Sequence, residues 1–77
     1  MWQKTKKSLR RVFEFEDFKS SMDFVRKVAA LAEKHNHHPD ILIEYDKVTL
    51  TLTTHHAGSI VTDLDEKMAS EIDGLLA

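Results

Sequence analysis

Alternating hydrophobic and polar residues near the N-terminus predict a β-hairpin. Residues 8–15 carry β-branched and aromatic side chains, and Leu9 and Phe13 fall on the same side of this stretch. Such alternation is typical of a strand that has one buried face. A shorter strand that begins near Trp2 is expected before it, and the polar residues 4–7 then form the turn of the hairpin.

The same alternation returns twice in the middle of the chain and predicts a second hairpin. It runs through residues 41–45, stops at Asp46 and Lys47, and resumes in residues 48–53. Two short alternating stretches joined by two polar residues are typical of antiparallel strands connected by a tight turn. The later strand has an apolar side for the core and a threonine side, which is left for solvent or for another subunit.

Between the two hairpins, apolar residues recur at intervals of three and four, which predicts a helix over residues 17–35. Asp17 is expected to be the N-cap, because its carboxylate can accept hydrogen bonds from the first free amides. The helix must end by about His38, because Pro39 has no amide hydrogen and disfavours helical geometry in the residue before it. The expected core stripe consists of Phe18, Met22, Val25, Val28, Ala29, Leu31 and Ala32.

A second helix is expected over residues 63–76. Thr62 and Asp65 have the spacing of a capping box, and Leu64, Met68, Ile72 and one of the two final leucines supply the apolar stripe. The order of elements is then β-β-α-β-β-α. This order predicts an α+β fold, in which a four-stranded antiparallel sheet carries two helices packed on one face, within a single domain over residues 1–77.

Size and composition narrow the classes of function and suggest an oligomer. The 77 residues include no cysteine for a disulfide, so we expect a homodimer or homotetramer to add the stability that one small core lacks. The net charge of -2 argues against a surface devoted to nucleic acid. We expect a cytoplasmic protein with no membrane partner, because no apolar run approaches the length of a membrane span or of a secretory signal.

The five histidines gather at two junctions between elements. His35, His37 and His38 lie where the first helix gives way to the second hairpin, and His55 and His56 follow the last strand of that hairpin. Because the hairpin folds its second strand back, the end of that strand returns to the place where the first strand began. We therefore expect the two groups of histidines to meet.

Three interpretations of this cluster compete. Taken singly, each histidine is most simply a surface residue at the end of an element. A metal site is the second interpretation, but adjacent histidines such as His37 and His38 usually point in different directions, and their spacing to His55 matches no common zinc pattern. The third is acid–base catalysis without a metal, because converging imidazoles can donate and accept protons on opposite sides of one small substrate near neutral pH.

The residues around these histidines resemble the signature of a known family. Residues 33–40 read Glu-Lys-His-Asn-His-His-Pro-Asp, Tyr45 follows six residues after the proline, and Thr54-His55 brings a histidine ten residues after the tyrosine, with Gly58 beyond it. This pattern is similar to that of the pterin-4a-carbinolamine dehydratases, and its spacing makes the similarity specific. The resemblance covers essentially the whole chain.

The resemblance implies a hydro-lyase whose catalytic groups are histidines. In that family, the residues that match His37, His38 and His55 act as acid and base, and the reaction needs neither a metal nor a cofactor. The substrate is a tetrahydropterin with a hydroxyl group at C4a, which loses water to give a quinonoid dihydropterin. The residues that match the family's substrate-binding positions are Glu33, Thr53, Thr54 and Asp65, with Asp63 as an alternative match for the last.

Two kinds of function are open within this family. The enzyme serves the recycling of tetrahydrobiopterin, and some members also act as dimerisation partners of a homeodomain transcription factor. The alternative for this chain is therefore a non-catalytic binding module of the same fold. The presence of His37, His38 and His55 favours the enzyme, because a pure interaction protein has no physical need for these three imidazoles.

Overall fold

The chain folds in the expected order of two strands, a helix, two strands and a helix, and the computed structural model describes residues 1–76. The elements are β1 (Gln3–Lys4), β2 (Leu9–Glu14), α1 (Phe18–His35), β3 (Asp40–Glu44), β4 (Lys47–Leu52), the short 3₁₀ helix η1 (His55–Ala57) and α2 (Asp63–Gly74). The predicted α+β class is therefore confirmed. Within residues 1–76, no helix combines the length and the apolar character that crossing a membrane requires.

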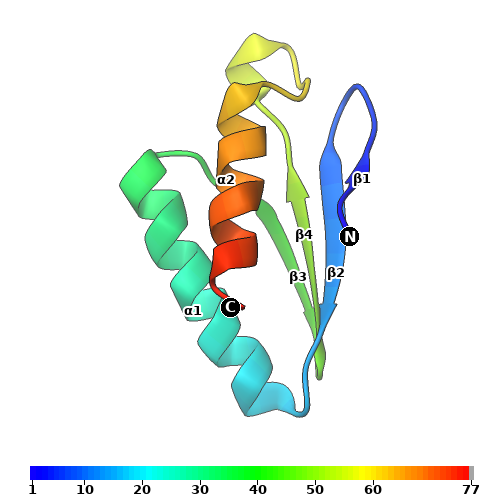
Figure 1. Ribbon diagram of the computed structural model, residues 1–77, viewed down its shortest axis with the longest axis vertical. Coiled ribbons are helices and arrows are strands. Elements are labelled where there is room, and N and C mark those ends of the chain that lie inside the picture. The colour runs from blue at the N-terminus through cyan, green and yellow to red at the C-terminus, as the bar shows by residue number, and fades with distance from the viewer. Residues whose placement is uncertain (77) are drawn as a thin grey trace.

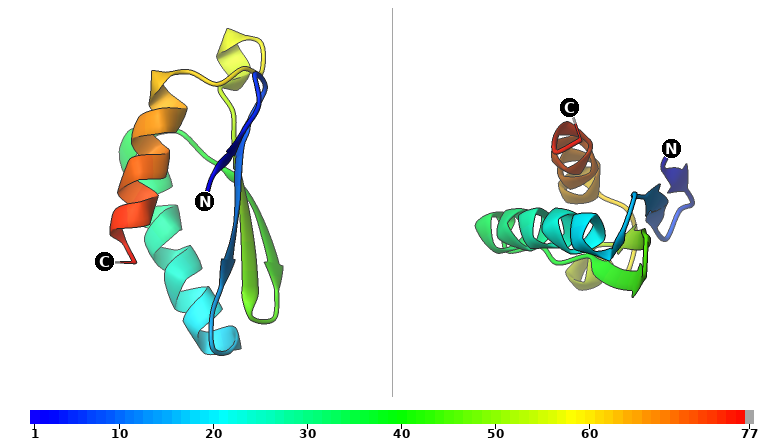
Figure 2. Two further views of the ribbon diagram at one scale, coloured as in Figure 1. Left: turned by 45° about the vertical axis from the view of Figure 1, so that its right-hand side comes forward. Right: turned by 90° about the horizontal axis from the view of Figure 1, so that it is seen from below.

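The four strands form one antiparallel sheet in the order β1-β2-β4-β3. Figures 1 and 2 show that both helices lie on the same face of this sheet, as predicted. The opposite face carries the threonine side of β4, and no helix of residues 1–76 lies on it (Figure 2), although Thr49 on this side is buried. The C-terminal end of α1, η1 and the N-terminal end of α2 lie together at one end of the molecule (Figure 1).

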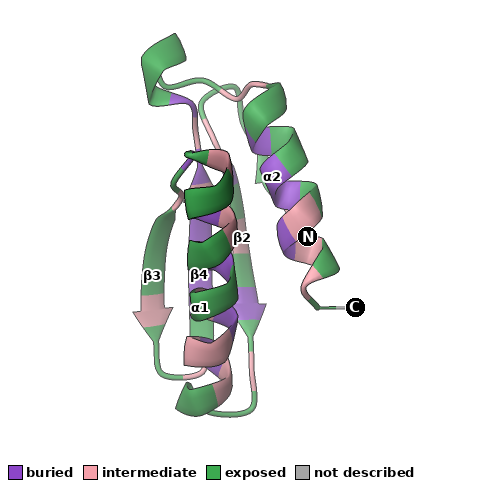
Figure 3. Ribbon diagram, turned by 90° about the vertical axis from the view of Figure 1, so that its left-hand side faces the viewer, coloured by how far each residue is buried: buried purple, intermediate pink, exposed green. Residues whose placement is uncertain are grey.

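The core lies between β4 and the two helices. Val48, Leu50 and Leu52 of β4 alternate toward the helices and are completely buried, as are Val28 of α1 and Ile72 of α2. Figure 3 shows this buried layer along β4 and along the inner sides of both helices. Burial of such an aliphatic side chain contributes about 1.5–3 kcal/mol, so β4 is the element on which the stability of the domain most depends.

Asp17 caps α1 as expected, because its Oδ1 accepts the amide hydrogen of Ser20 at 2.8 Å. The buried stripe of α1, however, is shifted from the predicted one and consists of Ser21, Phe24, Val28 and Ala32. Phe18 and Ala29, both expected in the core, are exposed. The shift follows from Phe24, whose ring packs on those of two other phenylalanines at centroid distances of 4.8 and 5.0 Å and so sets the rotation of the helix.

The turn between β3 and β4 lies at Tyr45 and Asp46, one residue earlier than expected. Lys47 was predicted in the turn, but it is the first residue of β4 and pairs with Glu44. Tyr45 was predicted in the strand, but its φ of 52° places it in the left-handed region. Positive φ at the first position of a two-residue turn suits the twist of the flanking strands, which explains the difference.

The carboxylate of Asp73 ties the N-terminal hairpin to the last turn of α2. Its Oδ1 accepts a hydrogen bond from the Trp2 indole at 2.9 Å and from the Arg11 guanidinium at 2.7 Å. The Trp2 ring also packs edge-on against Phe13, with ring centroids 5.8 Å apart. The helix itself ends at Gly74, two residues before the predicted end.

We predict that Asp73→Ala lowers the free energy of unfolding by about 1–3 kcal/mol, because it leaves the partly buried donors of Trp2 and Arg11 without an acceptor. Urea unfolding measures the loss, and the fluorescence of Trp2, the single tryptophan of the chain, reports on the same contact. Asp40→Ala is the matched control, because Asp40 is exposed and is expected to change stability by less than about 0.5 kcal/mol. Equal stabilities of the two variants would contradict the assignment.

Candidate functional site

The end of α1 directs His37 into the protein. Asn36 adopts the left-handed conformation, with φ 48° and ψ 44°, which asparagine tolerates better than most residues. The amide of Asn36 bonds to the carbonyl of Glu33, and the amide of His37 bonds to the carbonyl of Ala32 at 3.0 Å, so the helix ends in a Schellman motif. His37 is consequently only 9% exposed, whereas the next residue, His38, stays on the surface.

The fully buried carboxylate of Asp65, in the first turn of α2, gathers the site. Its Oδ1 lies 2.5 Å from His37 Nε2, and its Oδ2 accepts hydrogen bonds from the Thr54 hydroxyl at 2.7 Å and the Thr62 amide at 2.9 Å. Thr54 gives its one hydroxyl hydrogen to Asp65, so Thr62 is the donor in the 2.6 Å contact between the two hydroxyls. These four residues, which we call the Asp65 cluster, join three segments that are far apart in the sequence.

The Asp65 cluster holds its carboxylate in the ionised form. Burial alone raises the pKa of Asp65, but hydrogen bonds from Thr54, His37 and the Thr62 amide outweigh it and hold the pKa below the ordinary value of 3.8. The same carboxylate and Thr62 make the capping box that was expected at the start of α2. Asp65 thus serves the helix and the site together, and no side-chain surface of it is left for a ligand to touch.

The other two predicted catalytic histidines lie on the surface at the same end of the molecule. His38 Nε2 is 2.5 Å from Glu33 Oε2, and both side chains are exposed. His55 begins η1 and is exposed. The turn that carries it closes at Gly58, whose φ of 88° is one that glycine adopts without strain. Asp65 joins the two junctions, because it bonds both to His37 and to Thr54, the residue before His55. Within residues 1–76, no side-chain hydrogen bond joins a histidine of one group to a histidine of the other.

Thr53 and Thr54, the predicted substrate-binding threonines, differ in their backbone partners. The Thr54 amide bonds to Ile60 O at 2.9 Å, and its carbonyl accepts the amides of Ala57 and Ser59, both at 3.1 Å. The Thr53 hydroxyl donates a hydrogen bond to Lys7 O at 2.7 Å. The backbone N–H and C=O of Thr53 take part in none of the hydrogen bonds that the loops and turns of residues 1–76 make. The Thr53 peptide is thus the one available to a ligand.

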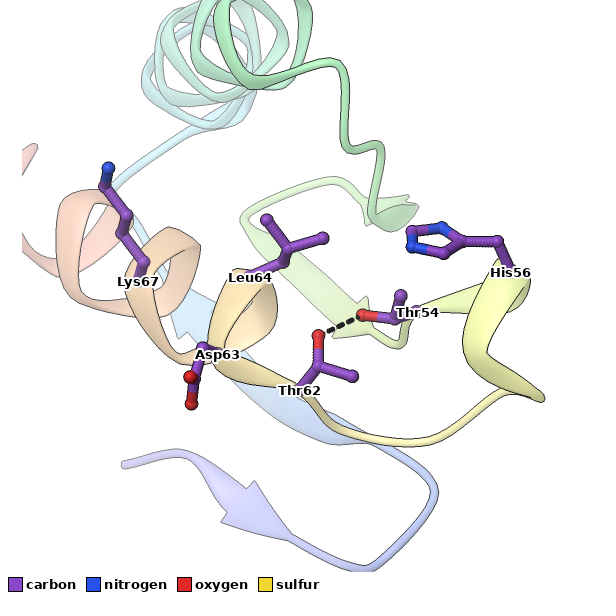
Figure 4. A pocket seen from close by; sticks show the side chains of 6 residues that line it. All are labelled: Thr54, His56, Thr62, Asp63, Leu64 and Lys67. Atoms are coloured by element: carbon purple, nitrogen blue, oxygen red, sulfur yellow. Dashed lines mark hydrogen bonds between the residues drawn. The ribbon is translucent and has the colours of Figure 1, made fainter.

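A cavity of about 380 Å³ opens beside the Asp65 cluster, between η1 and the start of α2. Figure 4 shows the residues that line it: Thr54, His56, Thr62, Asp63, Leu64 and Lys67. Thr54 was expected to bind substrate, Asp63 was the alternative match to Asp65, and His56 belonged to the predicted histidine cluster, whereas His37, His38 and His55 do not line this cavity. His56, which follows the predicted catalytic His55, is the histidine that borders this cavity.

The remaining histidine, His35, belongs to a contact between the two helices. Its Nε2 lies 2.6 Å from Glu71 Oε2 of α2, and both side chains are largely covered. Across the part of the chain that the structure describes, no group of three or more histidine, aspartate or glutamate side chains is placed to hold one metal ion.

Sequence comparison identifies relatives along nearly the whole chain. The sequence profile of the family described as "Pterin 4 alpha carbinolamine dehydratase" matches residues 1–75. A protein of Sulfurisphaera tokodaii is 47% identical over 75 residues, which cover 97% of this chain and 80% of the relative. A protein of Koribacter versatilis is 49% identical over 72 residues, which cover 94% of this chain and 76% of the relative. Both relatives carry the provisional name pterin-4-alpha-carbinolamine dehydratase.

Two solved structures share the fold. One, described as a transcriptional coactivator/pterin dehydratase from Brucella melitensis, has a TM-score of 0.91 and 37% identity, covering 99% of this chain and 82% of the other. The second, described as a pterin dehydratase-like protein that is a RuBisCO assembly factor in the alpha-carboxysome, has a TM-score of 0.77 and 25% identity, covering 97% and 86%. Proteins with this fold are therefore described both as a pterin dehydratase and as an assembly factor.

We predict that the lowered pKa of Asp65 makes the protein sensitive to acid. A carboxylate whose pKa is lower in the folded state stabilises the fold fully above its ordinary pKa of 3.8, and this stabilisation is lost as the pH falls through the folded-state pKa. Asp65→Asn is expected to lower the free energy of unfolding at neutral pH by about 1–3 kcal/mol and to flatten its decline below about pH 5.

Urea unfolding at a series of pH values measures both effects. Asp63→Asn is the matched control, because Asp63 lies two residues away and is exposed. A parallel decline with pH in Asp65→Asn and in the wild type would show that Asp65 does not carry the acid sensitivity.

Proposed function

The chain belongs to the pterin-4-alpha-carbinolamine dehydratase family, and we propose that it catalyses the loss of water from 4a-hydroxytetrahydropterin through His37, His38 and His55. The observation that carries the proposal is the buried pair of His37 and Asp65, next to a cavity of about 380 Å³. A buried carboxylate that holds a histidine ring is the arrangement by which proteins prepare an imidazole for proton transfer. A cavity of this size is in the usual range for a small-molecule site.

His37 is proposed to be the general base. The ionised Asp65 accepts a hydrogen from Nε2, which fixes the neutral tautomer in which Nδ1 has a free lone pair. Nδ1 then takes the proton from N5 of the pterin, and the negative charge of Asp65 stabilises the imidazolium that forms. Asp65, which is completely buried, acts in this scheme as a positioning residue, although the family resemblance implies a substrate-binding role for it.

His55 is proposed to be the general acid, and His38 to orient the ring or assist. As the C4a–O bond breaks, His55 gives a proton to the departing hydroxyl, which leaves as water. The N5–H bond breaks toward His37, and its electron pair forms the N5=C4a double bond of the quinonoid dihydropterin. The contact of His38 with Glu33 fixes the direction of the His38 ring, which is the role we give to Glu33.

Thr53 is proposed to hold the ring of the substrate through its backbone. Its peptide lies at the end of β4, directly before Thr54 of the Asp65 cluster, and has the donor and acceptor that the amide and amine edge of a pterin requires. The hydroxyl and the peptide of Thr54 already make hydrogen bonds within the protein. We therefore propose that Thr54 helps to orient Asp65 and forms part of the cavity wall. Tetrahydrobiopterin recycling is the physiological role that the family resemblance implies for this reaction.

A protein-binding module is the second candidate, favoured by the descriptions of the two structural relatives as a coactivator and as an assembly factor. If this candidate is correct, a variant in which His37, His38 and His55 are all replaced still binds its protein partner. The dehydratase proposal predicts that their replacement abolishes its function.

We also propose that the chain forms a homodimer or homotetramer. β3 is an edge strand of the sheet, and it exposes 38% of Ile41 and 53% of Leu42, which is apolar surface that a second copy can cover. Light scattering after size-exclusion chromatography is expected to give two or four times the chain mass of 8.9 kDa. A particle of 8.9 kDa at micromolar concentration would rule out this assembly.

We predict that His37→Ala and His55→Ala each lower the rate of carbinolamine dehydration by about 100-fold or more, since acid–base catalysis by one group contributes about 10²–10⁴-fold. His38→Ala is expected to lose less. The assay follows quinonoid dihydropterin formed from synthetic carbinolamine, with a chelator present throughout.

His35→Gln is the control for these variants, because His35 contacts Glu71 between the helices and has no proposed part in catalysis. Circular dichroism confirms that each variant is folded. Equal rates for wild type, His37→Ala and His55→Ala would remove the dehydratase proposal, and activity that disappears only with chelator would favour a metal site.

Asp65→Asn adds a test of the positioning role. It is expected to reduce kcat more than it raises KM and to change the pH profile of kcat, because the His37 tautomer is no longer held by a charge. A change in KM alone would assign Asp65 to substrate binding instead.

A further inference from the structure

The cavity beside the Asp65 cluster has polar side chains that the fold does not use. Thr54 and Thr62 belong both to its lining and to the cluster, and their hydroxyls are committed there. His56 and Lys67, by contrast, form no ion pair or side-chain hydrogen bond with any of residues 1–76. A cation and an imidazole without structural tasks therefore border a cavity that adjoins the proposed catalytic centre.

The absence of a partner for Lys67 is not due to a lack of carboxylates nearby. Asp63 lies one helical turn before Lys67, where an ion pair within the helix is possible. Figure 4 nevertheless shows the Asp63 carboxylate directed away from His56 and Leu64, on the other side of the start of α2 from the Lys67 ammonium group. The other neighbouring carboxylates are engaged elsewhere, Glu66 with Lys4 and Glu71 with His35.

These observations favour a ligand that brings negative charge into the cavity. Lys67 provides a full positive charge on a flexible side chain, which runs away from His56 in Figure 4 and can turn toward a ligand. A ring N–H of His56 can donate a hydrogen bond to the same ligand. The apolar side chain of Leu64 lies between them in Figure 4 and can cover the carbon atoms that precede a charged end. The lining therefore suits a short chain with an apolar beginning and an oxyanion at its end.

We propose that this cavity binds an oxyanion, a phosphate or a carboxylate, at the end of the pterin side chain, and that Lys67 and His56 select substrates that carry it. The inference rests on the proposed function, because it places the pterin ring at the neighbouring histidines. It assigns an anionic side chain to the preferred substrate, in place of the neutral side chain of tetrahydrobiopterin.

The test measures binding of stable pterins that do not react, so that it is independent of dehydration. Pterin-6-carboxylate, a 6-hydroxymethylpterin phosphate ester and neutral 6-hydroxymethylpterin are titrated into the full chain, and pterin fluorescence gives each Kd. At least one anionic pterin is expected to bind roughly five- to tenfold more tightly than the neutral one, as a charge-assisted contact at a partly exposed site provides. The preference is expected to shrink at high salt.

Lys67→Gln and His56→Gln are each expected to reduce this preference, and together to abolish it. Lys47→Gln is the matched control, because Lys47 is an exposed lysine at the other end of β4 and is expected to leave the ratio of affinities unchanged. Comparison of the two anionic pterins identifies whether phosphate or carboxylate is the preferred oxyanion.

Equal affinities for neutral and anionic pterins in the wild type would overturn the inference, as would a preference that survives in the double variant or the absence of binding by any pterin. Turnover of carbinolamine without a charge preference overturns only the inference. A preference that depends on Lys67, found together with absent turnover, supports the inference and overturns the dehydratase proposal.

Discussion

The buried carboxylate of Asp65 is the interaction on which the arrangement of the site depends. An ionised group inside a small domain is costly unless every oxygen is paired, and here three donors from three separate segments provide the pairing. His37 comes from the end of α1, Thr54 from the end of β4, and Thr62 from the start of α2. Because the carboxylate needs all three, the positions of these segments are coupled to one another.

This coupling supports the chemistry that we propose for such a small fold. The core along β4 supplies the stability through aliphatic side chains, which cannot orient polar groups by hydrogen bonds. The Asp65 cluster adds directional contacts at one end of the molecule, and the contact of Asp73 with Trp2 and Arg11 adds them beside the other end of α2. The hydrogen bond to a buried charge orients the ring of His37, as the proposed proton transfer requires.

The elements of the fold could be predicted from the sequence because their periodicities are strong, and the differences lie where tertiary contacts choose between neighbours. The predicted stripe of α1 began at Phe18 and left out Phe24, and only the packing of Phe24 on other aromatic rings decided which face is buried. The turn of the second hairpin moved by one residue because Tyr45 adopts a positive φ, which no local signal indicated. Helix and strand ends are set by such contacts more than by propensity.

The site, like the fold, could be predicted only where local sequence patterns determine it and not where tertiary contacts do. The meeting of the two histidine junctions follows from the hairpin topology, and the capping box pointed to Asp65, but its burial against His37 depends on how α2 lies over the sheet. The proposed role of His56 and Lys67 could not be predicted, since it depends on their lining one cavity and on their lacking partners. Absence of a partner is a property of the folded protein alone.

The pairing of β4 on both of its edges limits where this chain can gain or lose residues. Leu52 and Thr54 are buried and Thr53 between them is more exposed, so inward and outward positions alternate up to the Asp65 cluster. A deletion within β4 inverts that parity and turns its aliphatic side chains toward solvent. Residues 57–60 are exposed, but their backbone bonds back to Thr54 and His55, so the length of this turn is constrained as well. The register of β4 and the turn after it therefore have to be kept together for Thr54 to stay beside Asp65.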